Sequence, residues 1–143
     1  MDKENLGQPL DLLEIWNNLP FPKFLGYEVK SCAEGRCIIE LPVNPNVIGP
    51  FNVVHGGVFY SLCEVSTFLA AATVLPGDKV SVTNDINISV LKFVSGGTLL
   101  VEAWVLKSGK RSCFVEARIT DDSGQPVAVA RASKMIISKP SPS

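Results

Sequence analysis

Histidine is nearly absent from this 143-residue chain, which contains one, at position 55. A single imidazole excludes metal sites built from several histidines, and we expect no metal ion. A strong excess of one charge is also absent, because the formal net charge is −1 and the 13 Lys and Arg residues are scattered. Nucleic-acid binding needs a clustered basic face, so we do not expect DNA or RNA as a partner.

Cysteine pairs with the spacing of metal or redox motifs are missing too. The chain contains no Cys-x-x-Cys pair, and most of its cysteines lie within apolar runs. This pattern predicts buried, free thiols in a reducing compartment. The four cysteines are Cys32, Cys37, Cys63 and Cys113.

A signal peptide and a membrane span are not expected either. The first residues lack the charged start and apolar core of a signal peptide, which predicts a cytoplasmic protein. The run from Val53 to Leu75 is nearly all apolar or small and has about the length of a span. Glu64 lies in its middle, however, and a carboxylate at the bilayer centre costs about 2.5–3.5 kcal/mol. We therefore expect no membrane as a partner.

The length of the chain fits one domain, because about 150 residues can bury roughly 70% of their unfolded surface around a single core. We predict a single domain over residues 10–137, a flexible N-terminus over 1–9 and a disordered tail over 138–143. The domain should begin with a short amphipathic helix at Leu10–Trp16, which two following prolines end. This helix is expected to act as a lid or brace on the core.

A long apolar segment dominates the middle of the chain. Residues Gly57 to Leu75 are rich in Ala, Leu and Phe and are too many for a strand, which indicates a helix that is apolar almost all round. Such a helix must be wrapped by protein on most sides. Six strand-like runs can supply the wrapping: Tyr27–Ala33, Arg36–Val43, Val80–Leu91, Thr98–Lys107, Ser112–Thr120 and Pro126–Ile137. We predict an α+β fold, in which a strongly curved antiparallel sheet of about six strands surrounds the long helix, with a short N-terminal helix added.

Glu64 is the one ionisable side chain between His55 and Asp78, and most of its sequence neighbours are apolar. An unpaired charge in such surroundings costs several kcal/mol, so the carboxyl is either neutral with a raised pKa or faces a polar pocket. Both states suit a catalytic group. The alternative is a structural carboxylate, capped by backbone N–H groups or lying with Ser61 on a partly wet strip of the helix.

One histidine and two glycines stand at the start of the predicted helix. His55 and Glu64 are nine residues apart, about 13.5 Å along a helix and on opposite sides of it, so they cannot form a dyad within one helix. His55 either orients a substrate carbonyl or only fastens the preceding loop. The N–H groups of Gly56 and Gly57 can form an oxyanion hole, unless the glycines serve the backbone conformation alone.

The separation of Gly57 and Glu64 bears on the number of subunits. They are seven residues apart on one face of the helix, about 10.5 Å along its axis. One carbonyl carbon would not easily contact both groups. We therefore infer a site that combines Glu64 of one subunit with the helix entrance of another, which requires at least a dimer.

The run from His55 to Glu64 resembles the His-Gly-Gly helix entrance of hotdog-fold acyl-CoA thioesterases, in which an acidic residue follows the histidine by nine places. The similarity extends over residues 25–137. The chain looks like the PaaI-like, phenylacetate-degradation type or like the 4-hydroxybenzoyl-CoA thioesterase branch of that superfamily. The resemblance implies a hotdog fold and hydrolysis of acyl-CoA thioesters. It implies Glu64 as general base or nucleophile, the Gly56 N–H as the group that polarises the carbonyl, and Thr83 as the residue that orients water.

The same resemblance implies several binding residues. Family members tend to carry Asn or Gln six places before the histidine, where this chain has Gly49. Asn46 and Asn52 are the nearby amides, and an insertion in the loop would return Asn46 to the site. Lys110 and Arg111 are candidates for binding the nucleotide phosphates, or else they only solubilise a hairpin. No cofactor is implied, because coenzyme A is part of the substrate.

The family assembles as dimers whose sheets join edge to edge, commonly paired into tetramers. The resemblance therefore implies a homodimer with the active site at the subunit interface, and a homotetramer built from it. Two other functions stay open: a non-catalytic acyl-CoA-binding protein on the same scaffold, and a 3-hydroxyacyl thioester dehydratase. Hotdog dehydratases usually have His-Phe-Pro-Gly where this chain has His55-Gly56-Gly57-Val58. The acyl group cannot be read from the sequence, because it depends on tertiary packing.

Overall fold

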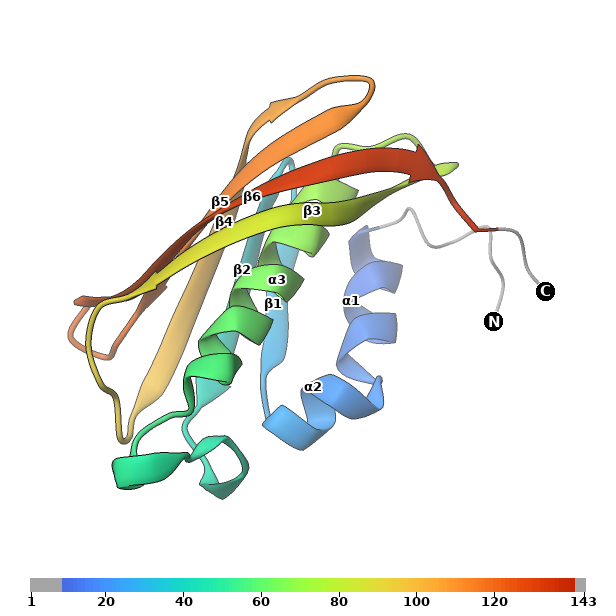
Figure 1. Cartoon of the computed structure of the whole chain (residues 1–143). Coiled ribbons are helices and arrows are strands. Elements are labelled where there is room, and N and C mark those ends of the chain that lie inside the picture. The colour runs from blue at the N-terminus through green and yellow to red at the C-terminus, as the bar shows by residue number, and fades with distance from the viewer. Residues whose placement is uncertain (1–8, 141–143) are drawn as a thin grey trace.

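A six-stranded antiparallel sheet curves around the long helix α3 in the computed structural model, which describes residues 9–140 (Figure 1). The strands lie in the order β1-β2-β4-β5-β6-β3. The helices are α1 Pro9–Asn17, α2 Pro20–Leu25 and α3 Gly56–Ala72, with 3₁₀ turns η2 Pro45–Val47 and η3 Pro50–Asn52. The strands are β1 Glu28–Ala33, β2 Arg36–Pro42, β3 Lys79–Val90, β4 Thr98–Ser108, β5 Ser112–Thr120 and β6 Pro126–Ser138. The predicted α+β arrangement is confirmed.

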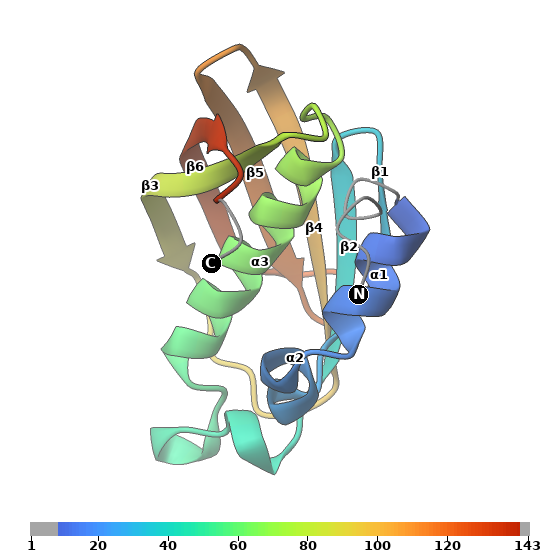
Figure 2. The same ribbon diagram turned by 90° about the vertical axis from the view of Figure 1, so that its right-hand side faces the viewer.

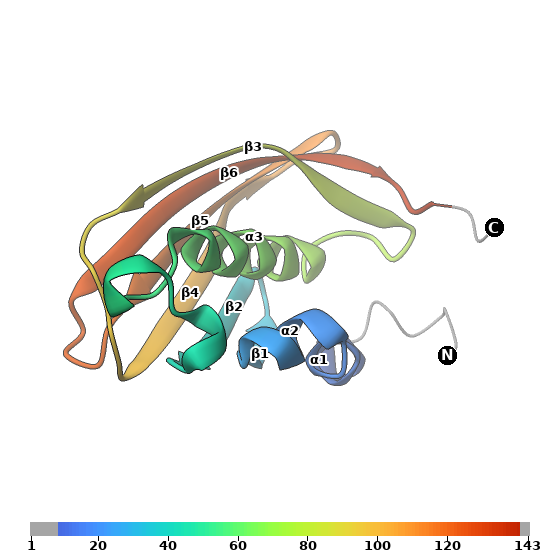
Figure 3. The ribbon, with the colours of Figure 1, turned by 60° about the horizontal axis from the view of Figure 1, so that its bottom comes forward.

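The core lies between α3 and the inner face of the sheet, which arches over the helix (Figure 3). Most side chains of α3 are buried, including Leu62 and Leu69, because strands cover the helix on several sides. In β5, every second residue from Cys113 to Ile119 is buried, and this confirms the alternation predicted for that strand. All four cysteines are buried and free, as predicted.

The two edges of the sheet differ in what covers them. Helix α1 lies beside β1 at one edge, and β3 forms the other edge (Figure 2). The Asn17 side chain makes two hydrogen bonds to the backbone of Val29. Its Nδ2 donates to Val29 O at 3.1 Å, and its Oδ1 accepts from Val29 N at 2.8 Å. These bonds occupy backbone groups that an added strand would need. Among the side chains of residues 13–140, none makes such bonds to the backbone of β3.

The prolines that were expected to end the first helix begin a second one. Pro20 is the first residue of α2, where a missing N–H costs little and the fixed φ of proline suits a helix. Gly26 closes α2 with a left-handed conformation at φ +85°. Helix α3 also ends earlier than predicted, at Ala72 instead of Leu75, where the hydroxyl of Thr73 turns back to donate to a carbonyl of the last turn at 2.8 Å.

The ordered elements reach slightly beyond the limits predicted for the domain. Pro9 already belongs to α1 and Ser138 to β6, so the predicted boundaries fall inside these two elements. The rest of the predicted flexible N-terminus, 1–8, and the last residues of the predicted tail, 141–143, lie outside the described residues. Across the part of the chain that the structure describes, no helix is long and apolar enough to pass through a bilayer.

Candidate active site

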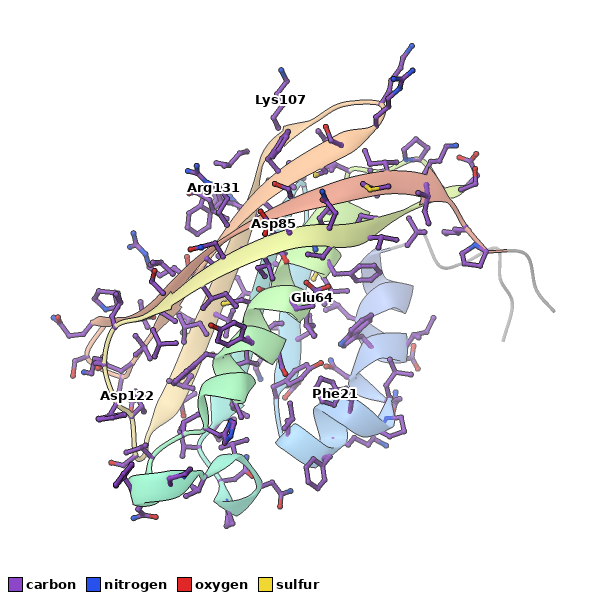
Figure 4. All side chains as sticks on the ribbon, viewed as in Figure 1. Phe21, Glu64, Asp85, Lys107, Asp122 and Arg131 are labelled. Carbon is purple, nitrogen blue, oxygen red and sulfur yellow. The ribbon has the colours of Figure 1, made fainter. Side chains whose placement is uncertain are left out.

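Glu64 lies near the middle of α3, on the side of the helix next to β3 (Figure 4). Its side chain is 45% exposed. The apolar sequence neighbours of Glu64 suggest an enclosed carboxylate, but the structure does not enclose it. Ser61, Phe68 and Ala72 lie at helical spacing on the same side of α3 and are also only partly buried. They mark a strip of the helix that the sheet leaves uncovered. The carboxylate is therefore accessible to a ligand.

A hydroxyl group from β3 contacts both oxygens of this carboxylate. Thr83 Oγ1 lies 2.9 Å from Glu64 Oε1 and 2.8 Å from Glu64 Oε2. The pairing of β3 with β6 becomes irregular between Thr83 and Asp85, so a local bulge follows the threonine. The structure thus brings together two of the candidate catalytic residues, which are 19 positions apart in the sequence.

Lys134 of β6 completes a cluster with Glu64 and Thr83, and it was not predicted from the sequence. Its side chain is 0% exposed, its Nζ donates to Thr83 Oγ1 at 2.6 Å, and its Nζ lies 3.9 Å from Glu64 Oε2. Burial lowers the pKa of Lys134, and the charges of Glu64 and Cys113 act in the opposite direction. The sequence does contain a signal for its burial. Lys134 falls on every second residue of β6 together with the buried alanines, and alternate residues of a strand face the same side, so Lys134 lies on the core face.

The buried ammonium has a testable effect on stability. The pKa of Lys134 is lowered in the folded state, whereas in the unfolded chain it is about 10.4. Between these values the unfolded state holds the extra proton, so the free energy of unfolding rises with pH there. We expect Lys134→Met to be at least as stable as the wild type at neutral pH, because the partner carboxylate is half exposed and is not left buried without a counter-charge. Urea denaturation should show this difference shrinking toward about pH 10, and a difference that grows with pH would contradict the assignment.

His55 is the N-cap residue of α3, and its Nδ1 accepts the N–H of Gly57 at 2.9 Å. The Gly57 N–H is therefore engaged and not free for an oxyanion, which corrects the prediction for this residue. Because Nδ1 is an acceptor, the ring carries its proton on Nε2. The N–H of Gly56 has no acceptor among the backbone groups of residues 9–140 and the side chains of residues 13–140, and a Cβ built on Gly56 would meet nothing within 4 Å. Gly56 thus offers an accessible donor at the positive end of the helix.

The loop before α3 folds back on itself. His55 N donates to Val47 O at 2.9 Å and Ile48 pairs with Val54, so residues 49–53 form a loop that is closed at its base. The Asn46 Nδ2 group donates to a carbonyl of α2 at 2.7 Å. Gly49 packs directly on the histidine, since a Cβ at this position would lie 3.1 Å from His55 Cβ. An amide side chain would therefore not fit at position 49 without movement.

Three further candidates lie apart from this cluster. Asn52 is exposed in the looped-out segment, with φ +60°. Lys110 and Arg111 are exposed in the turn between β4 and β5, at the opposite end of α3 from His55 (Figure 1). Lys110 lines a cavity of about 480 Å³ there, together with residues 74–76 just after the end of α3. Within one chain, the structure does not bring these two basic residues to the helix entrance.

A curved antiparallel sheet wrapped around one long helix is the hotdog fold, and solved structures share it. The thioesterase HI1161 of Haemophilus influenzae superposes with a TM-score of 0.83 at 26% identity, over 92% of this chain and 91% of that protein. The PaaI protein from the phenylacetic acid degradation operon of E. coli superposes with a TM-score of 0.81 at 21% identity, over 95% and 96% of the two chains. The predicted hotdog fold is confirmed.

A family model described as the thioesterase superfamily matches residues 51–128, more than half of the chain. The chain belongs to this superfamily. The 1,4-dihydroxy-2-naphthoyl-CoA hydrolase of Listeria monocytogenes is 28% identical over 109 residues, 76% of this chain and 89% of that protein. A putative esterase of Saccharolobus solfataricus is 31% identical over 116 residues, 80% of this chain and 81% of that protein. These relatives support hydrolysis of a thioester as the class of reaction.

Proposed function

We propose that this protein hydrolyses acyl-CoA thioesters to a free acid and coenzyme A, with Glu64 activating water or attacking the carbonyl itself. The observation that carries the proposal is the Glu64 carboxylate, which is accessible on one side and contacted through both oxygens by Thr83. The Listeria relative, a 1,4-dihydroxy-2-naphthoyl-CoA hydrolase, likewise takes a CoA thioester as substrate by its name. The acyl group stays open.

The reaction needs a nucleophile, a donor for the carbonyl oxygen and a proton for the leaving thiolate. In the general-base route, Glu64 takes a proton from water as the water oxygen bonds to the carbonyl carbon, and it returns this proton to the CoA thiolate as the C–S bond breaks. In the nucleophilic route, a carboxylate oxygen bonds to the carbonyl carbon, the C–S bond breaks, and the CoA thiolate leaves and takes a proton from solvent. Water then hydrolyses the resulting anhydride to the free acid and the Glu64 carboxylate. Negative charge develops on the carbonyl oxygen in both routes, and the Gly56 N–H at the helix N-terminus is suited to stabilise it.

A single chain does not offer these two groups to one carbonyl. Gly56 and Glu64 belong to one continuous helix and are eight residues apart, about 12 Å along its axis. A thioester carbonyl is far smaller than this separation. We therefore assign the Glu64 and the Gly56 of one active site to two different subunits, so that the site forms at a dimer interface.

The open edge of β3 is the surface that suits the second subunit. The opposite edge of the sheet is closed at β1 by the side chain of Asn17, whereas β3 is a strand of 12 residues at the other edge. Exposed apolar side chains lie on β3, on the segment after it and on α3: Val82, Val90, Leu91, Phe93 and Tyr60. Exposed apolar groups beside an unpaired strand edge are typical of an interface. Antiparallel pairing of two β3 strands would continue the sheet from one subunit into the next.

Co-expression of two impaired variants tests whether the active site is shared between two subunits. Glu64→Gln and Gly56→Pro each remove one half of the site, so each homodimer should be nearly inactive. In a heterodimer, one of the two sites combines an intact Glu64 with an intact Gly56, and equal co-expression should restore about a quarter of the wild-type activity. A co-expressed preparation no more active than the two variants expressed separately would place both groups within one subunit.

A panel of CoA esters tests the proposed function itself. The purified protein is incubated with short-chain, medium-chain, long-chain and aromatic acyl-CoA, and the released thiol is measured. We expect kcat/KM above about 10⁴ M⁻¹ s⁻¹ for at least one ester. Acyl-CoA binding in a calorimeter without thiol release from any ester would overturn the proposal in favour of a binding protein.

A further inference from the structure

Lys134 is the one fully buried basic side chain among residues 9–140. A buried ammonium is costly unless neighbouring groups compensate its charge and accept its N–H groups. An apolar side chain would fill a core-facing position of β6 without this cost. The lysine therefore points to a role that needs a donor or a positive charge.

The contacts of Lys134 determine the direction of two successive hydrogen bonds. An ammonium group has only donors, so Thr83 Oγ1, 2.6 Å from the Lys134 Nζ, must accept. The Thr83 hydroxyl has one proton of its own, and the oxygens of Glu64 lie 2.8 and 2.9 Å from its Oγ1. An ionised carboxylate only accepts, so this proton points to Glu64. The donors thus run from Lys134 through Thr83 to Glu64.

We propose that Lys134 is a positioning residue, which holds the Thr83 hydroxyl as a donor to Glu64 and so fixes the reacting carboxylate. The inference rests on the proposed function, because it needs Glu64 to be the reacting group. It also restricts Thr83. With its proton given to Glu64, the hydroxyl cannot donate to the substrate carbonyl, and toward the attacking water it can act only as an acceptor.

Such fixing matters because the carboxylate is half exposed. A glutamate side chain open to solvent samples several rotamers, and ordering it costs conformational entropy. Lys134 itself is enclosed completely by packing, so its ammonium is held in place. A charge-assisted hydrogen bond from this ammonium makes the hydroxyl a stronger donor. The enclosed ammonium of Lys134 thereby orders the accessible carboxylate of Glu64.

A double-mutant cycle separates action through Thr83 from independent action. We expect Lys134→Met and Thr83→Val each to lower kcat about 10- to 100-fold, with little change in KM. The double variant should be no slower than Thr83→Val alone, because Lys134 acts only through the hydroxyl. Losses that multiply in the double variant would overturn the proposal. Lys107→Met is the matched control, since it removes an exposed lysine at the end of β4 and should keep the wild-type rate.

The pH dependence of kcat distinguishes a positioning role of Lys134 from a purely structural one, because a structural lysine would not change it. The ionisable groups that face Lys134 are Glu64 from α3 and Cys113 from β5, and β3 contributes the Thr83 hydroxyl. Burial lowers the pKa of Lys134, and the neutral amine can accept the hydroxyl proton and reverse the bond. We expect kcat to fall at alkaline pH in the wild type and in Cys113→Ser, but not in Lys134→Met or Thr83→Val. The same alkaline fall of kcat in Thr83→Val would overturn the proposal. The comparison of Thr83→Val with the wild type leaves Lys134 itself in place.

The positioning role and the proposed function can fail separately. If the wild type hydrolyses no ester of the panel, the proposed function fails, and a crystal structure of Lys134→Met still decides the positioning role. We expect Glu64 in that variant to leave Thr83 or to occupy several rotamers. An unchanged contact between Glu64 and Thr83 would overturn the positioning role.

Discussion

Glu64→Gln should keep the fold and lose about 10³-fold in kcat. Glutamine has the size of glutamate, and its carbonyl oxygen can still accept the Thr83 hydroxyl, but it neither takes a proton from water nor attacks a thioester. Because the replaced side chain is half exposed, the free energy of unfolding should change by less than about 1 kcal/mol. Thiol release from the best ester of the panel measures kcat, and thermal unfolding measures stability.

Glu116→Gln is the matched control for this loss. Glu116 lies on β5 and accepts from Arg131 Nη2 at 2.6 Å, outside the cluster of Glu64, Thr83 and Lys134. The substitution makes the same chemical change and removes the same charge, so its rate should equal that of the wild type. A rate near the wild-type value in Glu64→Gln would show instead that the helix carboxylate is structural.

Water labelled with ¹⁸O separates the two routes open to Glu64. In a single turnover, the general-base route places the label in the free acid and never in the protein. Attack of water on the enzyme side of an anhydride places it in the carboxyl group of Glu64, where mass spectrometry of the peptide can find it. A labelled peptide therefore assigns the nucleophilic route.

The fold could be predicted because its signals are local in the sequence. The alternation in Ser112–Thr120 and the Gly-containing turns define strands and hairpins without tertiary information. The apolar run around Glu64 is too long for a strand and must be wrapped, which implies the curved sheet. The helix entrance from His55 to Gly57 is likewise a local motif, and it locates one half of the candidate site.

The rest of the site depends on contacts that the sequence does not display. Lys134 is 51 positions from Thr83, and it reaches the hydroxyl because β6 pairs with β3 in the sheet. The engagement of the Gly57 N–H depends on the rotamer of His55, which a motif does not specify. The position of Lys110 depends on the direction in which β4 and β5 cross α3, and this direction carries their turn away from the helix entrance.

Gly56→Pro should remove the other half of the site without unfolding the helix. Proline is favoured as the first residue of a helix, where an N–H has no intrahelical acceptor. His55 before it has ψ +135°, the extended conformation that a residue preceding proline adopts. A Cβ on Gly56 meets nothing within 4 Å, so the Cβ side of the ring has space. The thermal stability should therefore stay the same or rise, because proline also restricts the unfolded chain.

The catalytic effect of Gly56→Pro should be large nonetheless. Removing one oxyanion donor costs about 10²- to 10³-fold in kcat, and the Gly57 N–H cannot substitute while it donates to His55 Nδ1. Gly56→Ala is the matched comparison, because it adds a side chain and keeps the N–H. We expect the alanine variant to be much faster than the proline variant, with both unfolding at similar temperatures. Equal rates would remove the Gly56 N–H from the mechanism, and the charge on the carbonyl oxygen would then need another donor, such as the Nε2–H of His55.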